Sequence, residues 1–133
     1  MRALFVAFVL AVLSVLPIIA QERGPKDVIS SQIEAFKVDD FATAFTFAHP
    51  NIKNIFRTPE NFGRMVQQGY PMVWRPAEVE YLEQRELGGQ VFQDVQIVDD
   101  KGRVFVLEYA MIETPEGWKI SGVRILERGT ISA

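Results

Sequence analysis

Cysteine is absent from the 133-residue chain, and histidine occurs once, as His49. Without cysteine the protein has neither disulfide bonds nor thiolate chemistry. Zinc and the other transition metals are held by several His, Cys or clustered carboxylate ligands. A structural or catalytic metal site is therefore not expected.

Basic clusters and phosphate-binding loops are also lacking. Lys and Arg are scattered singly along the chain, so we expect no binding to nucleic acid or to an anionic membrane surface. The pair Gly88-Gly89 separates two predicted strands, and no helix follows it whose N-terminus could bind a phosphate. Nucleotide binding is not expected, and no cofactor is implied.

A long hydrophobic run lies at the N-terminus. After Met1-Arg2, the residues from Ala3 to Ala20 are apolar except for Ser14. This pattern is typical of a secretory signal peptide spanning residues 1–20, with cleavage after Ala20. We therefore expect export, to the periplasm or out of the cell. The run is also long enough to span a bilayer, so an uncleaved membrane anchor is the alternative.

The remainder of the chain has the composition of one globular domain. Hydrophobic residues make up 48% of the sequence and charged residues 23%, which is a folded rather than a disordered balance. Without residues 1–20, thirteen Lys and Arg stand against seventeen Asp and Glu, a net charge of −4. We expect a linker at residues 21–26, a single domain at 27–127 and a C-terminal tail at 128–133.

Residues 28–48 predict two helices that share one apolar stripe. Asp27 is expected to cap the first helix, and Asp39 or Asp40 to cap the second. Apolar residues recur at spacings of three and four through both helices, at Val28, Ile29, Ile33, Phe36, Phe41, Ala44, Phe45 and Ala48.

A third helix is predicted from Thr58-Pro59 to Gly69. Thr58 can cap it, Pro59 suits its first position, and Gly69 is expected to close it in the left-handed conformation. Residues 70–76, with the sequence YPMVWRP, are expected to be extended, because a proline disfavours the helical conformation of the residue before it.

Four β-strands are predicted in the second half of the chain. They occupy residues 79–87, 90–98, 103–113 and 118–126, and short turn sequences rich in Gly, Asp and Pro separate them. The fold class is therefore α+β, with N-terminal helices packed on a four-stranded antiparallel meander.

The third predicted strand is apolar on both faces. One face carries Phe105, Leu107, Tyr109 and Met111, and the other carries mainly Val, Ala and Ile with Glu108. Such a sheet needs two covers, and the three predicted helices supply one. We expect a second copy of the chain to supply the other, which makes the protein a homodimer through the outer face of the sheet.

Three segments carry a resemblance to a known family. They are IEAFKVDDFATAFTFAHPNIKNIF, FGRMVQQGYPMVWRP and GWKISGV, and the likeness extends over nearly all of residues 29–126. They resemble a family of small exported bacterial proteins known as a domain of unknown function (DUF4864-like). The resemblance implies export and the cone-shaped fold of the nuclear-transport-factor-2-like and cystatin-like superfamily. It brings no activity, substrate or catalytic residue.

His49 and Glu108 are the candidates for acid–base catalysis. Either could act as the base in a cavity of the cone, with a tyrosine as hydrogen-bond donor. Tyrosine occurs at Tyr70, Tyr81 and Tyr109. The alternative is a structural His49 that closes the second helix in the turn around Pro50.

Large aromatic residues with an arginine predict a ligand pocket. An apolar pocket with one polar anchor uses such residues, and the segment 74–76 is placed to cover the mouth of the cone. The candidate ligand-binding residues are Tyr70, Trp74, Arg75, Tyr81, Tyr109 and Trp118. The alternative is that the aromatics are ordinary core residues and Arg75 binds neighbouring carbonyls.

These features favour a non-enzymatic exported protein that binds a small apolar or amphipathic ligand, or an envelope protein. Two alternatives remain open: an isomerase, dehydratase or hydrolase of the cone type, and a subunit used for interaction alone. The interior distinguishes them. A cavity with His49 and a carboxylate inside favours an enzyme, an open apolar cavity favours ligand binding, and a filled interior favours interaction.

Overall fold

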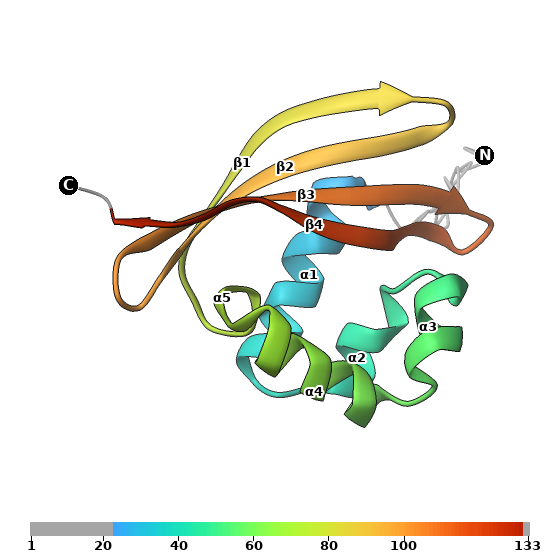
Figure 1. Cartoon of the computed structure of the whole chain (residues 1–133). Helices are drawn as coiled ribbons and strands as arrows, with labels where there is room; N and C mark the ends of the chain where they lie inside the picture. The colour runs from blue at the N-terminus through green and yellow to red at the C-terminus, as the bar shows by residue number, and fades with distance from the viewer. Residues whose placement is uncertain (1–22, 132–133) are drawn as a thin grey trace, which may run out of the picture.

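The computed structural model describes residues 23–131, and in these residues five helices precede four strands (Figure 1). The helices are α1 (Pro25–Lys37), α2 (Phe41–Thr46), α3 (Pro50–Phe56), α4 (Pro59–Gly69) and α5 (Pro71–Trp74). The strands are β1 (Pro76–Leu87), β2 (Gln90–Asp99), β3 (Arg103–Thr114) and β4 (Gly117–Ile131). The predicted signal peptide lies outside the described residues. Within residues 23–131, no helix has the length and apolar character to cross a membrane.

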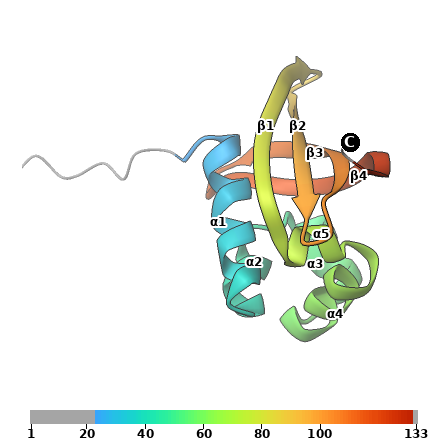
Figure 2. The ribbon, with the colours of Figure 1, turned by 90° about the vertical axis from the view of Figure 1, so that its left-hand side faces the viewer.

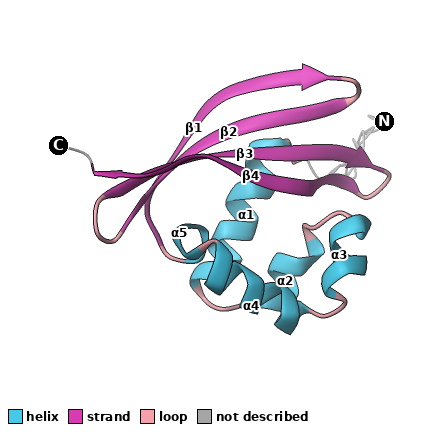
Figure 3. Cartoon of the chain, viewed as in Figure 1, coloured by secondary structure: helices cyan, strands magenta, loops and turns pink. Residues whose placement is uncertain are grey.

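The strands form one antiparallel sheet in the order β1-β2-β3-β4, so the predicted meander is confirmed (Figure 3). Gly88 and Gly89 both have positive φ angles, 59° and 78°, as the tight turn of a two-residue hairpin requires. The pairing shifts register between Tyr81 and Gln84, and again beside Ala110. Such bulges bend strands, and the sheet curves over the helices.

All five helices lie on one face of the sheet (Figures 1 and 2). The side chains of β2 and β3 alternate between fully buried on this inner face and half-buried on the outer face. The inner face contributes the following residues to the core: Val91, Val95, Ile97, Phe105, Leu107, Tyr109 and Met111. Helix α1 adds Ile29, Ile33 and Phe36 from its apolar stripe.

Helix α1 begins at Pro25, before residue 27, which was the expected start of the domain. Pro25 occupies the first turn of α1 and Gly24 is the N-cap, because a proline at the first helical position loses no hydrogen bond. Asp27 was predicted to be the cap of this helix, and that prediction was wrong. Asp27 lies in the first turn, and its Oδ2 accepts a hydrogen bond from the backbone N–H of Gly24 at 3.3 Å. At the other end, β4 continues to Ile131, beyond the predicted residue 126.

The aspartate pair after α1 divides into two roles. Asp40 caps α2, as predicted, and accepts hydrogen bonds from the N–H of Thr43 at 3.1 Å and from its hydroxyl at 2.6 Å. Asp39 is not a cap. It adopts a left-handed backbone conformation with φ of 56°, which Asp tolerates better than most residues.

Helix α3 was not predicted, and His49 begins it instead of closing the helix before it. Pro50 occupies the first turn, and His49 Nδ1 accepts a hydrogen bond from the N–H of Asn51 at 3.2 Å. The physical reason is the same as for α1: a proline that cannot continue one helix is well suited to start the next.

Residues 70–76 were predicted to be extended, and this prediction was wrong for the four of them that form α5. Tyr70 and Arg75, the residues that precede prolines, do lie outside the helical region, each with φ of −135°. The segment between them is long enough for one helical turn that begins at Pro71. The prediction for Gly69 was also wrong: Gly69 is the last residue of α4 and has no positive φ, and Tyr70 is the cap.

Candidate functional site

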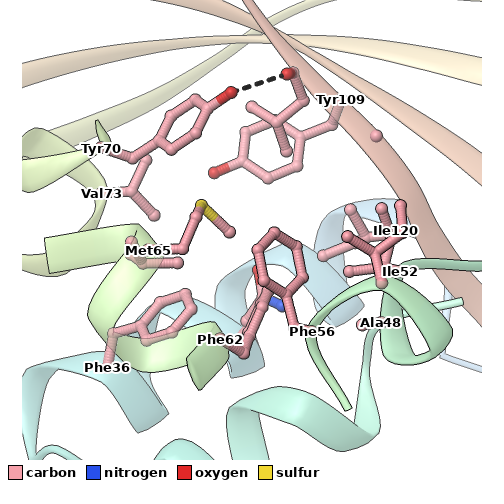
Figure 4. A pocket seen from close by; sticks show the side chains of 15 residues that line it. Phe36, Ala48, Ile52, Phe56, Phe62, Met65, Tyr70, Val73, Tyr109 and Ile120 are labelled. Carbon is pink, nitrogen blue, oxygen red and sulfur yellow. Dashed lines mark hydrogen bonds between the residues drawn. The ribbon is translucent and has the colours of Figure 1, made fainter. Parts of the chain in front are cut away.

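A cavity of about 290 Å³ lies between the helices and the inner face of β3 and β4 (Figure 4). Helices α1, α3, α4 and α5 contribute most of its walls. Its lining residues are Gln32, Phe36, Ala48, Ile52, Ile55, Phe56, Phe62, Met65, Val66, Tyr70, Val73, Tyr109, Ile120, Gly122 and Val123. Ile55 of α3 is 68% exposed, so the cavity reaches solvent beside α3.

The packing of α4 explains why this space is not filled. Helix α4 packs mainly against α2, α3 and α5 rather than on the strands. Phe62 of α4 is the centre of an aromatic cluster, with its ring centroid 5.8 Å from Phe36, 5.3 Å from Phe45 and 5.9 Å from Phe56. These ring contacts are tilted, with interplanar angles of 37°, 43° and 59°, and they hold α4 against α1, α2 and α3.

No Lys, Arg, His, Asp or Glu lines the cavity, and its polar side chains are Gln32, Tyr70 and Tyr109. Two of these three are engaged with the protein. Gln32 Nε2 donates to the carbonyl of Ala44 at 3.1 Å, and the Tyr70 hydroxyl donates to the carbonyl of Val123 at 3.2 Å. The walls therefore offer an uncharged, largely apolar surface.

Tyr109 is the exception. Its side chain is fully buried, and its hydroxyl has no hydrogen-bond partner among the described residues. In Figure 4 this hydroxyl points into the space between Tyr70 and Met65. Burial raises the pKa of Tyr109 well above its ordinary value of 10.0. A buried hydroxyl left without a partner costs about 1–3 kcal/mol of stability, so a ligand that accepts a hydrogen bond from Tyr109 would remove an unfavourable contribution to the free energy.

Trp74 and Arg75 lie away from the cavity and bind Asp39. Asp39 Oδ1 accepts hydrogen bonds from Trp74 Nε1 at 2.8 Å and from Arg75 Nη2 at 2.9 Å. Arg75 Nη1 also donates to the carbonyls of Phe36 at 2.8 Å and Trp74 at 3.1 Å. The alternative role of Arg75, binding neighbouring carbonyls, is thus the one that the structure shows.

Tyr81 and Trp118 lie in two further places. Tyr81 is half-buried on β1 opposite Val95, and its pKa is raised mainly by burial, with an opposing effect from its hydrogen bond to Ser30. Trp118 borders a second hollow, at the turn between β3 and β4. Of the six predicted ligand-binding residues, the structure therefore brings two to the cavity, Tyr70 and Tyr109.

The two candidate bases do not face each other. Glu108 lies on the outer face of β3, where its carboxylate pairs with Arg85 at 2.7 Å and Arg124 at 3.1 Å. His49 caps α3 at the other side of the sheet, and its backbone N–H donates to the carbonyl of Ile120 at 2.8 Å. Neither residue lines the cavity. Among residues 23–131, no group of three or more His, Cys, Asp or Glu is placed to hold a metal ion.

Sequence reasoning missed most of the cavity wall. The sequence of α4 has an apolar stripe at Phe62, Met65 and Val66, but such a stripe looks the same whether it packs against a side chain or borders a cavity. The missed residues include Ile52, Ile55, Phe56, Phe62, Met65 and Val73. The segment around Ile52 gave the one available signal, a short apolar stretch after His49-Pro50.

Comparison with known proteins supports the fold and the family. No curated protein matches the chain. Among solved structures, the chain is similar to a SEC-C motif containing protein from Rhodopseudomonas palustris, with a TM-score of 0.58, 13% identity, and coverage of 77% of this chain and 79% of that one. At this identity the likeness shows the fold alone. A family model matches residues 20–133, and the chain belongs to that family, which is described as a domain of unknown function (DUF4864).

Proposed function

We propose that this protein is a non-catalytic, exported domain that binds a small apolar or amphipathic molecule in the cavity beneath β3 and β4. The observation that carries the proposal is the cavity itself, about 290 Å³ in volume and free of charged side chains. Ligand sites in proteins are mostly apolar concavities of about 300 Å³ or more, so this one lies at the small end of the range.

The volume sets the size of the ligand. A dry cavity of about 150 Å³ accepts benzene, and the present cavity is about twice as large. Scaled from benzene by volume, it has room for a molecule of about a dozen non-hydrogen atoms. Such a molecule would leave water and restore the dispersion contacts that the lining side chains lack.

The open apolar interior favours ligand binding over the two alternatives. An enzyme would need a base in contact with its substrate, whereas His49 and Glu108 both lie outside the cavity. A subunit used for interaction alone would have a filled interior. Ligand binding is therefore the function that the geometry supports best.

The test is to close the cavity from its mouth. Ile52 is half-buried on α3, so Ile52→Trp is expected to place an indole in the cavity without displacing a buried residue. The probes are 2-phenylpentane and butyrophenone, which are neutral, mostly apolar and similar in shape. Leu87→Trp, at a position 72% exposed on β1, adds the same side chain far from the cavity.

Both probes are expected to raise the melting temperature of the wild type and of Leu87→Trp, and to leave that of Ile52→Trp unchanged. Native mass spectrometry of protein from its own host should also show a bound molecule. If no probe shifts the melting temperature of the wild type and nothing co-purifies, the proposal fails.

Export and the finer fold assignment belong to the same proposal. The apolar run from Ala3 to Ala20 supports a cleaved signal peptide, and N-terminal sequencing of the mature protein should then begin at Gln21. The order of helices followed by a curved meander is compatible with the cone of the nuclear-transport-factor-2-like and cystatin-like superfamily. An experimental structure compared with members of that superfamily would test the assignment.

We further propose a homodimer through the outer face of the sheet, which the described helices leave open (Figure 2). The half-buried side chains on this face include Val104, Val106, Ala110 and Ile112. Arg85 and Arg124 pair with Asp94 and Glu108 on this face, so these four charges are compensated within one copy of the chain. A monomer by light scattering at micromolar concentration would contradict this assembly and leave an envelope protein as the candidate partner.

A further inference from the structure

Two tyrosine hydroxyls lie at the top of the cavity, and one of them is used by the fold. The Tyr70 hydroxyl donates to the carbonyl of Val123, which is the residue paired with Tyr109 across β3 and β4. Tyr70 therefore ties the junction of α4 and α5 to the sheet. The Tyr109 hydroxyl has no partner among the described residues, so the fold does not explain why a tyrosine, rather than phenylalanine, occupies this position.

The position of Tyr109 leaves it little freedom to find a partner within the protein. Its ring is fully buried between the strands and the helices, and the apolar Met65 and Val73 line the cavity with it. The phenol carries its proton at neutral pH, because its ordinary pKa is 10.0 and burial raises that pKa further. Tyr109 thus holds an unpartnered hydrogen-bond donor, covered by its neighbours, in the wall of an apolar cavity.

We propose that Tyr109 is the polar anchor of the cavity and selects an uncharged ligand with one acceptor oxygen, such as a ketone, ester or ether on an apolar body. This inference rests on the proposed function of ligand binding. The acceptor would receive the proton of the Tyr109 hydroxyl, and the body would occupy the apolar remainder of the cavity. A hydrogen bond made only with the ligand gives direction and selectivity to an otherwise non-directional site.

Because the lining has no charged side chain, it disfavours ionised ligands. A carboxylate or an ammonium group would lose its hydration on entry and would find no opposite charge among the lining residues, which is a large penalty. A fatty acid anion is therefore a poor ligand, although its apolar tail would fit.

Access to the anchor requires a neighbouring side chain to move, because the Tyr109 oxygen is covered. Met65 lines the same cavity. Met65 is half-buried on α4, and an unbranched methionine side chain adopts new rotamers readily. A rotation of this side chain would admit the acceptor oxygen of a ligand.

The experiment compares a ketone with a hydrocarbon of the same shape. Butyrophenone and 2-phenylpentane are titrated by calorimetry into the wild type, Tyr109→Phe and Tyr81→Phe. Tyr81→Phe removes the same hydroxyl from a tyrosine that does not line the cavity. The ligand-free Tyr109→Phe protein should be at least as stable as the wild type, since the hydroxyl it loses has no partner.

We expect Tyr109→Phe to bind butyrophenone about tenfold more weakly than the wild type, by the size of one net hydrogen bond. Binding of 2-phenylpentane should be unchanged or slightly tighter, and Tyr81→Phe should behave as the wild type. The carbonyl stretching frequency of bound butyrophenone should be lower in the wild type than in Tyr109→Phe, because the hydrogen bond weakens the C=O bond.

The remaining outcomes separate the two proposals. If each probe binds the wild type and Tyr109→Phe with the same affinity, and the carbonyl frequency is the same in both, Tyr109 is not the anchor. The proposed function of ligand binding then stands. If neither probe binds either protein, both proposals fail. If benzoate binds as tightly as butyrophenone, the exclusion of charged ligands is wrong and the inference is overturned.

Discussion

The indole nitrogen of Trp74 donates a hydrogen bond to Asp39 Oδ1 at 2.8 Å, across 35 residues of sequence. Arg75 shares the same carboxylate oxygen at 2.9 Å and lies over the Trp74 ring, with Cζ 4.0 Å from the ring centroid. This contact joins the turn between α1 and α2 to the end of α5, where the chain enters β1. The left-handed backbone of Asp39 positions its carboxylate for this link.

The first prediction concerns this link. Asp39→Ala removes the acceptor and places a residue with Cβ but no polar side chain at φ of 56°, so it should lower the midpoint of chemical denaturation. Asp39→Asn keeps an acceptor for Trp74, and Asn tolerates the left-handed region. The denaturation midpoint of Asp39→Asn should therefore fall less than that of Asp39→Ala. Equal losses for the two variants would show that neither the hydrogen bond nor the backbone preference matters here.

The second prediction is a loss of stability in acid. The hydrogen bonds from Trp74 and then Arg75 hold the pKa of Asp39 below its ordinary value of 3.8, and the hydroxyl and N–H of Thr43 do the same for Asp40. A carboxyl group with a lowered pKa in the folded state stabilises the protein above pH 3.8. This contribution is lost as the pH falls through the folded pKa.

The measurement is the melting temperature of the wild type and of Asp39→Asn from pH 7 down to about pH 2. The wild type should lose more stability than Asp39→Asn in the region below the ordinary pKa of the carboxyl. Parallel curves would mean that Asp39 does not titrate differently in the folded and unfolded states.

The third prediction tests the core under the sheet. Leu107 is 0% exposed on the inner face of β3, and Leu107→Ala should cost about 2–5 kcal/mol because it leaves a cavity in a packed interior. Leu87→Ala makes the same change at an exposed residue and should stay within about 0.5 kcal/mol of the wild type. Both values come from denaturant unfolding, and similar costs would contradict the assigned inner face.

The fourth prediction compares two glycines of α4. A Cβ on Gly63 would lie 2.6 Å from Cγ and Cδ1 of Phe41, so Gly63→Ala should destabilise the protein by displacing that ring. A Cβ on Gly69 would meet nothing within 4 Å, and Gly69→Ala should stabilise by about 0.5 kcal/mol through helix propensity. A stabilised Gly63→Ala protein would show that the Phe41 ring moves without cost.

The fifth prediction tests the structural role of His49 as the cap of α3. His49→Ala removes the cap of α3 and should cost about 0.5–2 kcal/mol. His49→Asn keeps an oxygen that can accept from the N–H of Asn51 and should restore most of that loss. Probe binding in the cavity should be the same in both variants. If His49→Asn were as unstable as His49→Ala, the observed contact from Asn51 would not contribute to stability.

The sequence alone determined the elements whose signals are local. Thr58-Pro59 predicts the start of α4, and Thr58 Oγ1 does accept a hydrogen bond from the N–H of Asn61 at 3.2 Å. Gly88-Gly89 predicts the β1–β2 turn, and the alternation in β3 predicts which side chains share a face. These features depend on the backbone preferences of proline and glycine and on the two-residue period of a strand. A few neighbouring residues are enough to show each of them.

Tertiary structure decided the rest. Helices α3 and α5 are short, and their packing on α4 and the sheet stabilises them more than their own sequences do. The apolar stripe of α4 packs against Phe36 and Phe45 through Phe62, and it borders the cavity through Phe62 and Met65. Whether Tyr109 finds a partner for its hydroxyl depends on groups from distant segments, because burial, cavities and unmet hydrogen bonds belong to the assembled chain and to no single stretch of it.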